Sequence, residues 1–178
     1  MSELLIKKKD SLTALWEFSQ MTIKKYSFHL QDLSISSESK DYQACSFYLN
    51  DQHVICRTAK ITPKKVGQFV TIWKRMNGGP IQPFDYSDSF NLLVINVQTN
   101  EHFGQFVFPK EILLKKGIIR SKSKVGKLGF RVYPPWDKTT NASATKSQRW
   151  QENYFLNLDS IESIDVERLK SLYSIQEF

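Results

Sequence analysis

The sequence has few cysteines and glycines and contains no long apolar run. Two cysteines, Cys45 and Cys56, are too few for a disulfide scaffold. No apolar run approaches the roughly 20 residues that a transmembrane helix needs. The opening residues, MSELLIKKKD, have no apolar stretch after their charges, so no secretory signal is expected. These absences favour a soluble cytoplasmic protein.

The chain has enough apolar and aromatic residues to build a core. Of its 178 residues, 40% are hydrophobic and 13% aromatic, which excludes global disorder. The length fits a single domain over residues 1–178. Within it we expect an N-terminal helix and polar connector over 1–41, a core over 42–156, and an acidic C-terminal helix over 157–178.

Strand-like segments dominate the middle of the chain. They are rich in β-branched and aromatic residues and are bounded by Asn, Asp, Gly and Pro: 44–50, 53–61, 67–75, 91–97, 103–109 and 129–134. Helices are predicted over 11–27, 109–117, 142–156 and 166–173, and the serine-rich stretch 34–41 is predicted to be a loop. Asn50-Asp51 predicts a tight hairpin turn, and 62–67 a longer one. The predicted class is α+β, with a mainly antiparallel, curled or pseudobarrel-like sheet of about six strands and flanking helices at both ends.

Positive charge is concentrated in two central blocks. The chain carries 25 basic and 18 acidic residues, a net charge of +7. Residues 57–84 hold six basic and no acidic side chains, and residues 102–136 hold eight basic and one acidic. Such blocks favour an anionic partner, because each neutralised phosphate releases counterions. A solvated basic surface is the alternative. A membrane-surface role is disfavoured, because the basic residues follow strand-like segments rather than an amphipathic helix.

Basic and aromatic residues of three motifs are the candidate contacts to nucleic acid. Lysines and arginines would bind phosphate, aromatic rings would stack on bases, and glutamines would read base edges. The candidates are Arg57, Lys60, Lys64, Lys65, Trp73, Lys74, Arg75, Lys127, Arg131, Tyr133, Trp136, Gln148, Arg149 and Gln151. Each also has a structural alternative. Trp73 would be a core residue, Arg131 would pair with Asp85 or Asp88, and the glutamines would cap loops.

Asp85 and Asp88 are the weaker candidates for a metal site. Two carboxylates three residues apart would hold Mg²⁺ if a third ligand joined them. Metal nucleases usually add an acidic-x-Lys strand, but here that pattern occurs only at Glu38-Ser39-Lys40, in the predicted loop. Turn-forming aspartates are the alternative. The three histidines lack zinc-site spacing, and no cofactor is expected.

Five segments together resemble the MepB family of small bacterial proteins, first noticed beside multidrug-efflux genes. These segments are RTAKITPKKVGQFVTIWKR, GPIQPFDYSD, GQFVFPKEILLKKGI, GKLGFRVYPPWD and SQRWQENYF, within residues 42–156. The family has no settled activity, and the resemblance implies a link to nucleic-acid binding. GQFVFPKEILLKKGI also resembles the strand–Pro–helix element of pseudobarrel DNA-binding domains, at the level of fold.

The sequence thus predicts a nucleic-acid-binding protein, DNA or RNA, that uses a basic, aromatic-lined face without catalysis and without a membrane. Two alternatives stay open. One is a metal-dependent nuclease or phosphodiesterase using Asp85 and Asp88. The other is an interaction domain for an acidic protein or a small anionic ligand.

Overall fold

A six-stranded sheet forms the centre of the computed structural model, which describes residues 29–160 and 164–174. Its order is β1-β2-β3-β8-β9-β11, and all neighbours are antiparallel except β3 and β8. The strands are β1 Leu30–Ile35, β2 Cys45–Leu49, β3 Gln52–Thr58, β8 Leu92–Gln98, β9 Phe103–Pro109 and β11 Phe155–Asn157. The α+β class and the mainly antiparallel sheet are confirmed. The order ends at β1 and β11, so the described strands do not close into a barrel, and the pseudobarrel-like curl stays a prediction.

A second sheet of three strands has the order β10-β5-β4, and a separate ribbon pairs β6 with β7. These strands are β4 Lys60–Thr62, β5 Lys65–Thr71, β6 Trp73–Arg75, β7 Ile81–Pro83 and β10 Gly129–Val132. The predicted strands 53–61 and 67–75 are each split in two. The splits fall at Ala59 and Ile72, which are buried and whose N–H groups make the last hydrogen bonds of the β3–β8 and β5–β10 pairings, to the carbonyls of Asn96 and Leu128. In each case one continuous strand-like sequence forms two strands that belong to different sheets.

Both predicted hairpins are present. Leu49 pairs with Gln52 around Asn50-Asp51, as expected. Thr62 pairs with Lys65, so the turn between β4 and β5 is shorter than the predicted 62–67.

Three α-helices and two 3-10 helices complete the described chain. They are α2 Lys110–Lys115, α3 Ala142–Gln151, α4 Val166–Leu172, η1 Lys40–Tyr42 and η2 Glu152–Tyr154. Side chains of Asn141 and Asp165 cap α3 and α4 by accepting backbone N–H bonds. The predicted helix 11–27 lies outside the described residues. None of the described helices has the length and the apolar run that crossing a membrane would require.

Two of the sequence predictions need correction. The predicted helix 142–156 ends at Gln151, because Phe155 and Leu156 bury their side chains while pairing with β9. The predicted loop 34–41 is also partly wrong, because β1 runs to Ile35 and η1 begins at Lys40. Leu33 and Ile35 of β1 alternate with serines but are exposed, and the serine-rich composition of the stretch favoured a loop instead.

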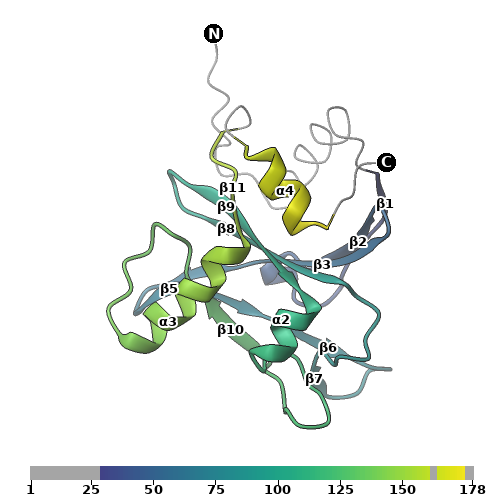
Figure 1. The fold of residues 1–178 in the computed structure, drawn as a ribbon. Coiled ribbons are helices and arrows are strands. Elements are labelled where there is room, and N and C mark those ends of the chain that lie inside the picture. Colours follow the sequence, from purple (N-terminus) through teal and green to yellow (C-terminus); the bar gives the residue numbers. More distant parts are fainter. Residues whose placement is uncertain (1–28, 161–163, 175–178) are drawn as a thin grey trace.

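Apolar side chains cover both faces of the large sheet. One cluster, including Val54 and Val94, packs with Leu169 and Leu172 of α4. The other cluster lies between the large sheet and the smaller sheet, with α2 contributing Leu113. Figure 1 shows α4 on one side of the large sheet and α2, α3 and β10 on the other. No buried residue of this second cluster comes from β1 or β2. A cavity lies on that side of these two strands.

Gly67 provides a test of this packing. It has φ +82°, and a Cβ there would lie 2.6 Å from the Tyr133 ring. Because backbone strain and overlap add, Gly67→Ala should lower the free energy of unfolding by about 3 kcal/mol in urea melts. Gly78→Ala is the control, since φ is +72° but nothing lies within 4 Å. It should cost about 1 kcal/mol. Equal losses in the two variants would show that Tyr133 does not pack against Gly67.

Candidate anion-binding site

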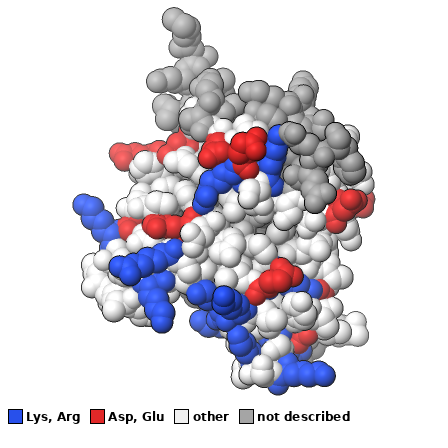
Figure 2. Space-filling view, in the orientation of Figure 1, with Lys and Arg blue, Asp and Glu red and all other residues white. Residues whose placement is uncertain are grey.

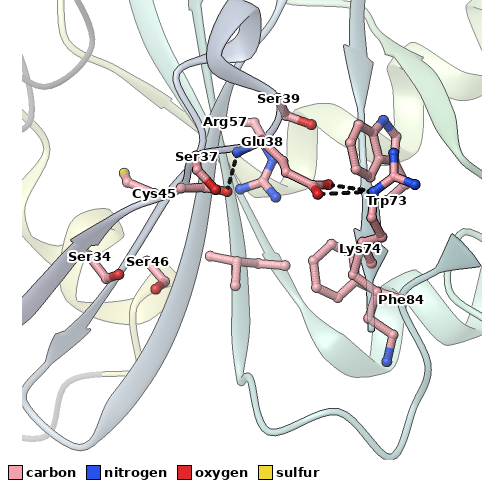
Figure 3. A pocket seen from close by; sticks show the side chains of 13 residues that line it. Ser34, Ser37, Glu38, Ser39, Cys45, Ser46, Arg57, Trp73, Lys74 and Phe84 are labelled. Carbon is pink, nitrogen blue, oxygen red and sulfur yellow. Dashed lines mark hydrogen bonds and ion pairs between the residues drawn. The ribbon is translucent and has the colours of Figure 1, made fainter. Parts of the chain in front are cut away.

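A cavity of about 420 Å³ opens between the β1–β2–β3 end of the large sheet and the β6–β7 ribbon. Ser34, Ser46 and Ile55 share one face of the large sheet, because Ser34 pairs with Ser46 and Ser46 pairs with Ile55. Arg57 follows two residues after Ile55 on the same face. The opposite wall consists of Trp73, Lys74, Arg75 and Phe84. Further serines come from the loop after β1: Ser36, Ser37 and Ser39. We call this space the serine–arginine cavity (Figure 3).

Arg57 is the most deeply buried cation of the cavity, with 7% of its surface exposed. Its Nη1 donates to the carbonyl oxygen of Cys56 at 2.8 Å, and its Nε is buried without a hydrogen-bond partner. Burial lowers the pKa of Arg57 from its ordinary value, yet a guanidinium stays charged in proteins. No carboxylate among the described residues forms an ion pair with it. A buried, uncompensated cation of this kind is strongly unfavourable unless an anion joins it.

The other two cations of the cavity already have acidic partners. Arg75 Nε lies 2.9 Å and 3.2 Å from the two carboxylate oxygens of Glu38, and Lys74 pairs with Asp88. The Arg75–Glu38 pair joins the serine loop to β6, and Figure 3 shows Glu38 extending across the cavity toward Trp73. The Arg75 guanidinium also lies over the Trp73 ring, 5.5 Å from its centroid. Trp73 itself is half-buried, so its ring is neither fully inside the core nor freely exposed.

Asp85 and Asp88 serve the turn that contains them. Asp85 accepts hydrogen bonds from the Ser87 backbone N–H and from Arg120 at 2.9 Å, and these hold the pKa of Asp85 well below its usual range. Asp88 accepts from the Asp85 backbone N–H at 2.7 Å and pairs with Lys74. Over 29–160 and 164–174, no three His, Cys, Asp or Glu residues are grouped to hold a metal ion. A metal between these aspartates would have to displace both Arg120 and Lys74.

Arg131 does not pair with Asp85 or Asp88, and that alternative is wrong. Its guanidinium donates to Thr62 Oγ1 at 2.6 Å and to the Gly67 carbonyl at 2.9 Å. Arg131 thus clamps the β4–β5 hairpin onto β10, whose pairing with β5 brings the two basic blocks side by side. Its donors are used within the fold, so a contact to phosphate would compete with the clamp.

Gln148 and Gln151 hold the segment after β10. Gln151 is 1% exposed, accepts from the Tyr133 N–H at 2.8 Å and donates to the Arg131 carbonyl at 3.0 Å. Gln148 donates to the carbonyls of Pro134 and Asp137 at 3.0 and 2.8 Å. Both amides therefore act as loop caps, which was the alternative to base reading. Reading a base would break these bonds.

The aromatic candidates of the second motif are half-buried. The Tyr133 ring packs against Gly67, and Trp136 stacks on His102 with ring centroids 5.0 Å apart. Both rings thus have partners within the protein, and neither forms part of the serine–arginine cavity.

The remaining candidates are exposed at several places. Lys60, Lys64 and Lys65 lie on the β4–β5 hairpin, Lys127 lies in the loop before β10, and Arg149 lies near the end of α3. Lys60 approaches Asp41 and the Tyr42 ring of η1. Figure 2 shows that Lys and Arg side chains also gather over α2, α3 and the loop after α2, with some acidic side chains among them.

Sequence reasoning found the cations and the tryptophan of the cavity but missed its serines and Glu38. Arg57, Trp73, Lys74 and Arg75 were candidates, and the structure places all four around one space. Four of the serines lie in the predicted loop 34–41, and Ser46 lies in the predicted strand 44–50, so neither pattern marks them as binding residues. The available signal was the number of serines, four within residues 34–39 and a fifth at position 46. Serine-rich stretches are typical of loops, so this signal did not indicate a binding site.

Comparison with known proteins places the chain in a family. The MepB-like family model matches residues 36–157. The chain belongs to the MepB-like family. A crystal structure of MepB is similar with a TM-score of 0.73 and 33% sequence identity, covering 86% of this chain and 99% of that one. This confirms the resemblance seen in the five motifs.

A more distant likeness is to the structure of a bacterial homing endonuclease. The TM-score is 0.44 and the identity 13%, over 80% of this chain and 91% of that one, which is too low to indicate a shared function. No curated protein matches the chain.

The role of Gln151 in this MepB-like chain can be tested. Gln151→Ala leaves the Tyr133 N–H and the Arg131 carbonyl without partners, so the free energy of unfolding should fall by about 3 kcal/mol. Arg149→Ala, two residues earlier and exposed, should change it by less than about 0.5 kcal/mol. Urea unfolding measures both. A Gln151→Ala variant as stable as the wild type would show that the amide does not support this loop.

Proposed function

We propose that this protein binds nucleic acid through phosphate contacts and a stacking ring at the serine–arginine cavity. The observation that carries the proposal is the convergence of Arg57, Lys74, Arg75 and Trp73 on one cavity. Cations supply affinity for any phosphate backbone, and an aromatic face accepts any base. This combination is typical of proteins that bind nucleic acid with little sequence preference.

A series of contacts links the cavity to further lysines. Arg75 pairs with Glu38 of the serine loop, this loop continues into η1, and the Tyr42 ring of η1 lies 5.1 Å from Lys60 on β4. The hairpin turn beyond β4 carries Lys64 and Lys65, both exposed. We call Lys60, Lys64 and Lys65 the hairpin lysines. We propose that they and the cavity bind the same nucleic-acid strand, and we call the two together the basic track.

A chemical argument favours non-catalytic binding at this track. The cavity contains one carboxylate, Glu38, and it is engaged by Arg75. Asp85 and Asp88 bond to Arg120, Ser87 and Lys74. Metal-assisted hydrolysis of a phosphodiester needs carboxylates free to hold a cation. Binding needs only the cations and hydroxyls that the cavity presents.

Fluorescence anisotropy with labelled single- and double-stranded oligonucleotides tests the proposal across salt concentrations. Wild-type protein should bind with a steep salt dependence. Lys64→Glu combined with Lys65→Glu should weaken binding to all sequences alike. It should also lower the slope of log K against log salt by about 0.7 to 0.9 for each phosphate that the variant no longer neutralises. No binding at low salt would overturn the proposal.

A control variant with the same change in net charge distinguishes binding at the track from attraction by the overall positive charge of the protein. Lys115→Glu with Lys122→Glu removes two exposed lysines from α2 and the loop after it, where Figure 2 shows the second group of basic side chains. This variant should bind nearly as well as the wild type. If its affinity falls as far as that of the Lys64/Lys65 variant, the α2–α3 face also binds the nucleic acid and the track alone is not the binding surface.

A further inference from the structure

We infer that the Arg57 end of the serine–arginine cavity receives a phosphate monoester, the terminal phosphate of a nucleic-acid strand. The inference rests on the proposed function and narrows it from any phosphate backbone to strand ends. It depends on three properties of the cavity: the guanidinium that no described carboxylate neutralises, the serine hydroxyls that line the same cavity, and the depth at which Arg57 lies.

The guanidinium is the strongest of these observations. Arg57 uses Nη1 for the Cys56 carbonyl and leaves Nε buried with no partner. A guanidinium offers its donors as a planar fork that matches two oxygens of one anion. The two other cations of the cavity have acidic partners, so Arg57 is the cavity cation that no described carboxylate neutralises. An incoming anion would satisfy both its charge and its orphaned N–H.

Serine hydroxyls supply the rest of a phosphate site. Ser37, Ser39 and Ser46 line the same cavity, and no hydrogen bond within the described chain engages their hydroxyl groups. Ser36 Oγ accepts the Glu38 N–H at 3.2 Å, which holds the serine loop in place. A phosphate oxygen accepts readily from hydroxyl and guanidinium donors together. Figure 3 shows Arg57 between the serine loop and the wall that carries Trp73.

Depth distinguishes a strand end from the interior of a strand. Only 7% of Arg57 is exposed, so a phosphate must enter the cavity to reach it. An internal phosphodiester carries the chain away on two sides and would need two exits. A terminal monoester has one covalent connection, three free oxygens and a charge of about −1.5 to −2 near pH 7. It therefore fits a buried cation better, and the adjacent base would come to lie toward Trp73.

The Glu38–Arg75 pair sets a limit on affinity. Glu38 is the one acidic side chain that lines the cavity, and its carboxylate repels an entering phosphate. Replacing it with glutamine removes that repulsion and releases Arg75. The structure thus provides two conservative substitutions with opposite expected effects, at Arg57 and at Glu38.

The experiment compares one single-stranded oligonucleotide carrying a 5′-phosphate, a 3′-phosphate or hydroxyls at both ends. An internal dye reports anisotropy at fixed salt. The wild type should bind one of the phosphorylated strands about tenfold more tightly than the unphosphorylated strand. Arg57→Gln should abolish the difference, whereas Glu38→Gln should increase it several-fold. Circular dichroism and thermal melting confirm that each variant is folded.

The outcomes separate this inference from the proposed function. Equal, salt-dependent binding of all three strands would overturn the strand-end inference and leave nucleic-acid binding in place. Tryptophan fluorescence measures the binding of adenosine 5′-monophosphate. If this mononucleotide binds but no oligonucleotide does, both the strand-end inference and the proposed nucleic-acid binding are overturned. If Arg57→Gln does not fold, the inference still fails when Glu38→Gln leaves the preference for a phosphorylated end unchanged.

Discussion

The burial of β8 on both faces is the constraint on which the rest of the fold depends. Leu92 to Val97 are all buried, so this central strand needs an apolar layer on each side. One side is covered by α4, and the other by the smaller sheet with α2 and α3. The parallel pairing of β8 with β3 places the long excursion through β4, β5, β6 and β7 between these two strands. That excursion forms the layer that covers the second face.

The candidate site exists because this second layer is narrower than the sheet beneath it. The buried cluster beneath β5 and β10 includes residues of β3, β8 and β9 but none of β1 or β2. Arg57 lies on β3 near the edge of this cover. It is deep enough to lose most of its water, yet it borders the cavity rather than the apolar core. A buried charge at such a boundary is less unfavourable when an ion of opposite charge can reach it. We propose that an anionic ligand does so.

Features of the fold that depend on local sequence pattern can be predicted from the sequence. Features that depend on contacts between distant segments cannot. Strand alternation in 67–75 puts Gln68, Val70, Ile72 and Lys74 on one face; the first three are buried, and Lys74 is half-buried. The same pattern could not reveal that the strand is interrupted at Ile72, because the chain there changes its pairing partner from β10 to β7, and both partners are distant in the sequence. Gln151 was equally unreadable. Its place on a helix next to arginine and tryptophan does not indicate that its side-chain amide bonds to the backbone N–H of Tyr133 and the backbone carbonyl of Arg131.

One residue, Ala59, separates β3 of the large sheet from β4 of the small one. Arg57 and Lys60 therefore lie on one nearly continuous piece of extended chain, and Lys64 and Lys65 follow at the turn after β4. At about 3.3 Å per residue, the backbone of Lys60 lies about 10 Å along the strand from that of Arg57. Thr58 and Lys60 are both paired in sheets on either side of Ala59, which limits how far this separation can change. A nucleic-acid strand whose end lies at Arg57 would have to span this distance before its backbone reached the hairpin lysines. Its length in nucleotides would therefore decide whether it contacts both.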